Sequence, residues 1–167
     1  TGNIEIGTGN AATGSAGSLT LAVGDSISST GGDVALRAGA QGGQVYIESG
    51  KGGSSTGGAI TLAAGSSQDG LGGSIIVRTG SGALTGRIAL ATGEATTSNS
   101  GSVSIDTGAA AAGSSGGISM LVGASGGLLG GSGSVSIKAG ESAQSIGGNV
   151  VLQSGHGGAV GGSLTLA

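Results

Sequence analysis

Aliphatic residues along this chain recur in pairs separated by a single residue, and each pair is framed by glycines. The repeating phrase is Gly-x-aliphatic-x-aliphatic-x-x-Gly, and twelve copies, some looser and the last truncated, are distributed along nearly the whole chain of 167 residues. In the copy at 133–140, Val135 and Ile137 turn to one face of an extended backbone, and Ser136 and Lys138 turn to the other. This alternation predicts a short, half-buried β-strand.

The segments between phrases are small, polar and rich in glycine, and they predict turns and arches. No segment of ten or more residues shows helical periodicity. One such strand cannot bury its two aliphatic residues alone, whereas stacked copies can, with rungs about 4.8 Å apart. The predicted fold is therefore all-β, a parallel β-solenoid or β-helix, formed by one repetitive segment over residues 1–167 without capping repeats.

The spacing of the phrases suggests how such a solenoid would be wound. The first aliphatic residues of successive copies are 15 residues apart at most steps, and steps of 11, 13 and 17 recur at every third position. This superperiod favours three short strands per turn and about four turns. The alternative is one phrase of about 15 residues per turn, which the alternating charges of consecutive phrases favour, because three strands per turn would stack Arg37 on Arg78.

Composition narrows the classes of function. The chain has 43 glycines, a single aromatic residue (Tyr46), no proline and no cysteine, so it is neither collagen nor held together by disulfides. Its regular aliphatic pairs distinguish it from a flexible Gly/Ser linker. A net charge of -3 and the lack of a basic patch or aromatic platforms argue against nucleic-acid binding. No apolar run is long enough to span a membrane.

Residues that could carry catalysis or bind a metal are scattered singly. His156, the only histidine, lies in a glycine-rich corner and is expected to face solvent. Lys51 follows Ser-Gly but lacks the Ser or Thr that a phosphate-binding loop requires after its lysine. The carboxylates never cluster and do not recur at the fixed position that a calcium β-roll needs. We expect no enzymatic activity, no catalytic residue, no cofactor and no metal.

Ice binding is the main functional alternative. With three strands per turn, one outward face would present Thr20, Thr61 and Ser104, and a row of hydroxyl groups can order water. Val151 would interrupt that row, and the other faces are irregular. A further alternative is a surface adhesin that binds polysaccharide, although such proteins normally present several aromatic residues. O-linked glycans on the Ser/Thr-rich segments are also compatible with the sequence, whereas no Asn-x-Ser/Thr acceptor is present.

Both ends of the sequence are ordinary phrases, whereas monomeric solenoids carry atypical caps. Uncapped ends favour head-to-tail pairing with other copies, a contact that propagates into an open fibre. The leading hypothesis is therefore a structural building unit of a filament or surface fibre that assembles by head-to-tail β-stacking.

The segment GSVSIDTGAAAAGSSGGISMLVG, together with its neighbours, resembles the Gly/Ser/Thr-rich repeat proteins of stramenopile algae and oomycetes, which contain long runs of GGSVSIxTG-type units. The resemblance extends over essentially the whole chain, although the motif is simple. It implies a structural role in an extracellular or cell-surface setting, and it offers no catalytic residues.

Overall fold

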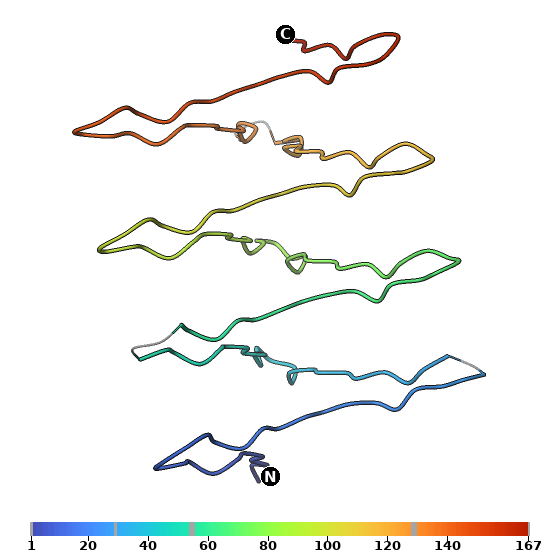
Figure 1. Cartoon of the computed structure of the whole chain (residues 1–167), viewed down its shortest axis with the longest axis vertical. Helices are drawn as coiled ribbons and strands as arrows, with labels where there is room; N and C mark the ends of the chain where they lie inside the picture. Colours follow the sequence, from blue (N-terminus) through green and yellow to red (C-terminus); the bar gives the residue numbers. More distant parts are fainter. Residues whose placement is uncertain (1, 29, 54–55, 128–129, 167) are drawn as a thin grey trace. The chain divides into compact units, whose positions relative to one another are not determined.

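The computed structural model describes residues 2–28, 30–53, 56–127 and 130–166, and these contain neither an α-helix nor a β-strand (Figure 1). The prediction of an all-β parallel solenoid or β-helix is therefore wrong for the single chain. Both versions fail, the one with three strands per turn and the one with a single phrase per turn. Thr1 and Ala167, which bound the predicted repetitive segment, lie outside the described residues.

The physical reason is the absence of a pairing partner for the phrases. A strand exists only when its N–H and C=O groups bond to a neighbouring strand. Among the described residues, the backbone–backbone hydrogen bonds join the glycine that ends one phrase to the glycine that opens the next. The alternation of apolar and polar residues thus locates the phrases, but it does not provide the inter-strand hydrogen bonds that would make them strands.

The chain divides into two units, Thr1–Gly86 and Arg87–Ala167. The first contains six phrases and the opening glycine of the seventh, and the second contains the rest of the seventh phrase and five more. We call the segments between phrases links. The prediction of one continuous repetitive segment over 1–167 stays a prediction. In the first unit, three links are closed by bonds from Gly43 N to Gly39 O (3.2 Å), Gly58 N to Gly50 O (2.9 Å) and Gly73 N to Gly65 O (2.8 Å). In the second unit, Gly148 N bonds Gly140 O and Gly162 N bonds Gly155 O, both at 2.9 Å.

Changes of chain direction are confined to the links. The bends and turns of the described residues lie at 12–14, 27–28, 40–42, 53, 68–70, 82–84, 96–98, 111–113, 143–145 and 158–160, and none of these falls within a phrase. The shortest link is a tight turn in which Gln41 and Gly42 have φ angles of 67° and 91°. The division into phrases and links that the sequence predicts is thus the division that the backbone follows.

Hydroxyl groups also close links by hydrogen bonds to the backbone. Thr8 Oγ1 donates to the carbonyl of Gly17, and Ser49 Oγ donates to the carbonyl of Gly58, both at 3.1 Å. Thr8 and Ser49 occupy the same position, the second-to-last residue of a phrase, and each acceptor opens the following phrase. Because each bond joins residues nine apart, it holds the two arms of a link together.

The second-to-last residue of a phrase also packs against the next opening glycine. A methyl group placed on Gly32 would lie 2.8 Å from Val23 Cγ1, and one on Gly133 would lie 3.0 Å from Val122 Cγ1. The equivalent contact, at 3.2–3.8 Å, recurs at Gly17, Gly43, Gly58, Gly73, Gly86, Gly101, Gly116, Gly148 and Gly162. All twelve phrases begin with glycine. At Gly32, Gly43, Gly58, Gly73 and Gly133 the two chain segments approach closely enough to disfavour a side chain, whereas the remaining contacts are at ordinary van der Waals distances.

No described residue is buried, so the described chain has no hydrophobic core. The accessible surface is 16548 Å². A folded monomer of this mass exposes about 7,000 Å², and a fully extended chain about 21,600 Å². The single chain therefore has ordered links but leaves most of its surface in contact with water.

Candidate functional site

The most distinctive surface of the molecule consists of the aliphatic pairs, the residues at the third and fifth positions of each phrase. Apart from Ile4, the first members are 50–61% exposed, and the second members are 60–84% exposed. Among the large apolar residues that the structure describes, only the second-to-last residues Val23 and Val122, at 46% and 38%, are better covered. Packing against the opening glycines thus shields a little apolar surface, and the pairs themselves stay open to solvent.

This exposed surface exceeds what a monomeric protein normally tolerates. Contiguous apolar patches on soluble monomers rarely exceed a few hundred Å², and larger ones indicate an interface or a tendency to aggregate. Here an aliphatic pair recurs in every phrase, so the apolar surface is repeated at regular intervals in both units. These exposed aliphatic pairs can bind another repetitive apolar surface.

The residues predicted to form an outward hydroxyl face are all exposed. Thr20 and Thr61 belong to the first unit and Ser104 to the second, and no hydrogen bond joins any two of them within the described part of the chain. The Ser104 hydroxyl donates to Oδ2 of Asp106. Ice binding through these residues stays a prediction.

Charged side chains form few contacts. Lys138 Nζ lies 2.6 Å from Glu141 Oε1, and both side chains are mostly exposed, so the pair contributes at most about 1 kcal/mol. The Tyr46 hydroxyl donates to Glu48 Oε2 at 2.9 Å. Over residues 2–28, 30–53, 56–127 and 130–166, no other ion pair is present.

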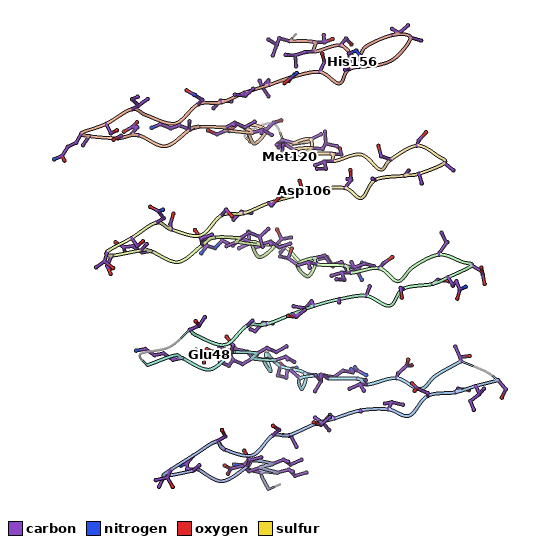
Figure 2. All side chains as sticks on the ribbon, in the orientation of Figure 1. Glu48, Asp106, Met120 and His156 are labelled. Carbon is purple, nitrogen blue, oxygen red and sulfur yellow. The ribbon has the colours of Figure 1, made fainter. Side chains whose placement is uncertain are left out.

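No constellation typical of a catalytic or metal site occurs in the described residues. They contain no group of three His, Asp or Glu residues placed to hold a metal ion. In the second unit, Asp106, Met120 and His156 lie on separate stretches of the ribbon (Figure 2). An open hollow of about 330 Å³ is lined by Arg78, Thr79, Gly80 and Ser81, four consecutive residues that contribute one charged group. The described residues also contain no helix long and apolar enough to cross a membrane.

The contact between the second-to-last residue of a phrase and the next opening glycine was not predicted from the sequence. Its signal was nevertheless present, because the opening position is glycine in all twelve copies. A position restricted to glycine in every copy indicates either a positive φ or a close approach. The structure shows the close approach.

Comparison of the chain with protein-family models, with curated proteins and with solved structures gives no match. The resemblance to Gly/Ser/Thr-rich repeat proteins of stramenopile algae and oomycetes therefore stays an expectation from the motif.

Proposed function

We propose that this chain is a structural building unit that assembles with other copies of itself into a filament or fibre. The observation that carries the proposal is the exposed surface of the single chain, 16548 Å², without a buried residue in the described part. That surface exceeds the value for a folded monomer of the same mass by about 9,500 Å².

Covering this excess of accessible surface requires extensive contacts with other molecules. A standard interface between two proteins buries about 1,200–2,000 Å² in total, and obligate interfaces bury about 2,000–5,000 Å² or more. One ordinary docking event would leave most of the aliphatic pairs uncovered. Coverage from several neighbours, along the whole length of the chain, fits the distribution of the pairs over all twelve phrases.

A second copy is a partner that presents the same series of aliphatic pairs. Because every phrase presents nearly the same surface, a phrase of one copy can contact any phrase of another. Such contacts join unlike parts of two identical molecules, and contacts of this kind propagate into open filaments when they do not close into a ring. Head-to-tail stacking of phrases between copies would also provide partners for the backbone N–H and C=O groups that the single chain leaves unpaired.

The setting proposed for this filament is extracellular or at the cell surface. Its support is the resemblance of the repeated GSVSIDTG-type phrase to the structural repeat proteins named above. Polysaccharide and O-linked glycans are the additional partners that such a setting would offer.

Assembly is tested by sedimentation velocity of the full chain over a range of concentrations, combined with negative-stain electron microscopy. The proposal expects species much larger than a monomer at micromolar concentration and elongated particles in the images. Monodisperse monomers at all concentrations would contradict it. If such monomers also shaped ice crystals, the ice-binding alternative through Thr20, Thr61 and Ser104 would replace it.

A further inference from the structure

Charged residues concentrate at two positions of the repeat. The first is the sixth position of the phrase, directly after the aliphatic pair, and the second is the first residue of the link. In chain order the sixth position holds Arg37, Glu48, Arg78, Asp106 and Lys138. The first link position holds Asp25, Lys51, Glu94 and Glu141.

Seven of these nine residues have no oppositely charged partner within the described part of the chain. Only Lys138 and Glu141 form an ion pair among the described residues, and it is exposed. Glu48 and Asp106 accept hydrogen bonds from Tyr46 and Ser104, respectively, but neither has a cationic partner. Unpaired charges at repeated positions are available to a neighbouring molecule.

Two copies can lie edge to edge in the same direction, with equivalent positions of their phrases in contact, at several different offsets. The signs of the charges make some of these offsets more favourable than others. In exact register, every charge would face its own copy, which is unfavourable at all nine positions. With an offset of one phrase, Arg37 meets Glu48 and no other opposite charges meet at these positions.

An offset of two phrases brings together four pairs of opposite charge and none of like charge. The pairs are Asp25 with Lys51, Glu48 with Arg78, Arg78 with Asp106, and Asp106 with Lys138.

An offset of three phrases would align the links of irregular length with one another. However, it places Arg37 beside Arg78 and Glu94 beside Glu141, against one favourable pair of Lys51 with Glu94. Opposite charges directly across from each other stabilise neighbouring segments, and like charges destabilise them, by roughly 0.2–1 kcal/mol per pair.

We propose that neighbouring copies of this chain lie edge to edge in the same direction with an offset of two phrases, so that the aliphatic pairs of one copy meet those of the next and the four charge pairs form between copies. This inference rests on the proposed function, since it specifies the contact through which the copies assemble. The occupant of the apolar surface is thus a second copy in a defined register. Because the offset leaves two phrases unmatched at each end of a pair, further copies can add in the same way, and the assembly stays open.

The test compares two variants that change the net charge equally. Arg78→Glu would place like charges beside both Glu48 and Asp106 of the neighbours, and we expect a roughly fivefold to tenfold rise in the critical concentration for assembly. Arg37→Glu is the matched control, because a two-phrase offset places Arg37 beside Gly7 and Ala63, which carry no charge. Arg78→Gln, which removes attraction without adding repulsion, should give an intermediate value.

Other outcomes are distinguishable. If both Arg78→Glu and Arg37→Glu lower the critical concentration, copies are offset by three phrases, because each variant then turns the Arg37–Arg78 contact into an opposite pair. If the two variants raise it equally, the charges act only through net charge, and the proposed register is wrong while assembly itself stands. If the wild-type chain forms no assembly at all, the proposed function fails first.

Discussion

The phrases and the links of this chain differ in where their contacts come from. Links are closed by the chain itself, through backbone bonds such as Gly73 N to Gly65 O, through hydroxyl bonds, and through packing against opening glycines. Phrases hold the aliphatic pairs, yet within the described residues they have neither strand pairing nor burial. The comparison indicates that local contacts shape the corners of the repeat, whereas its straight segments depend on another molecule.

The largest effect on assembly is expected when charges are placed in an aliphatic pair. Replacing Ile88 and Leu90 with Asp should raise the critical concentration for assembly at least tenfold, because burying an unpaired carboxylate in an apolar contact is very unfavourable. Ala89→Asp is the control, since Ala89 lies between the pair and faces the opposite side of an extended phrase. Light scattering against concentration measures the effect, and equal responses of the two variants would show that the pairs do not form the contact.

A smaller effect is expected in the tightest link. A methyl group on Gly43 would lie 2.7 Å from both the nitrogen and the oxygen of Gly39, so Gly43→Ala forces backbone movement. We expect it to weaken assembly by roughly 1–3 kcal/mol, seen as a lower melting temperature of the assembled state. Gly39→Ala, where a methyl group meets nothing within 4 Å, should change the melting temperature little. A larger loss from Gly39→Ala would contradict the close-approach account.

A more local effect should follow from removing one hydroxyl bond. Ser49→Ala deletes the 3.1 Å bond from Ser49 Oγ to the carbonyl of Gly58 and should destabilise that link by about 0.5–1.5 kcal/mol. Hydrogen exchange at the Gly58 amide, which bonds to Gly50 O, should accelerate by a corresponding factor. Exchange at Gly73, in the next link, serves as the internal reference and should stay unchanged.

The smallest effect is expected at the single ion pair. Glu141→Gln removes the partner of Lys138, but both side chains are mostly exposed, so stability should change by at most about 1 kcal/mol. The melting temperatures of the wild-type chain and the Glu141→Gln variant should differ less at high salt than at low salt, because salt screens exposed charges. A change as large as that for Gly43→Ala would mean that Lys138 and Glu141 become buried on assembly.

The sequence predicted correctly where the chain bends, but its predictions of strands in the phrases and of a solenoid were wrong. The positions of phrases and links follow from residue chemistry: glycine and small polar residues permit the bends at 68–70 or 143–145, and alternating aliphatic residues resist them. Whether Val135 and Ile137 become a strand depends instead on a backbone partner, and alternation cannot indicate whether that partner belongs to the same chain. The β-solenoid prediction assumed that it did.

The candidate interface was only partly predictable. The aliphatic pairs were recognised as the surface that needs covering, but they were assigned to an internal core, whereas Val135 and Ile137 are 55% and 62% exposed. The glycine contacts of the links, such as Gly32 with Val23, depend on how a link folds back, which spacing alone does not define.

Hydrogen exchange of the phrase amides as a function of protein concentration measures whether the phrases find their backbone partners in another copy. If the phrases need another copy, amides of Ile60, Ile88 and Val103 should exchange at nearly the unfolded rate in dilute monomer and become strongly protected in the assembled state. Strong protection of the same amides in a chain that sediments as a monomer would contradict the account, because the single chain would then supply its own partners.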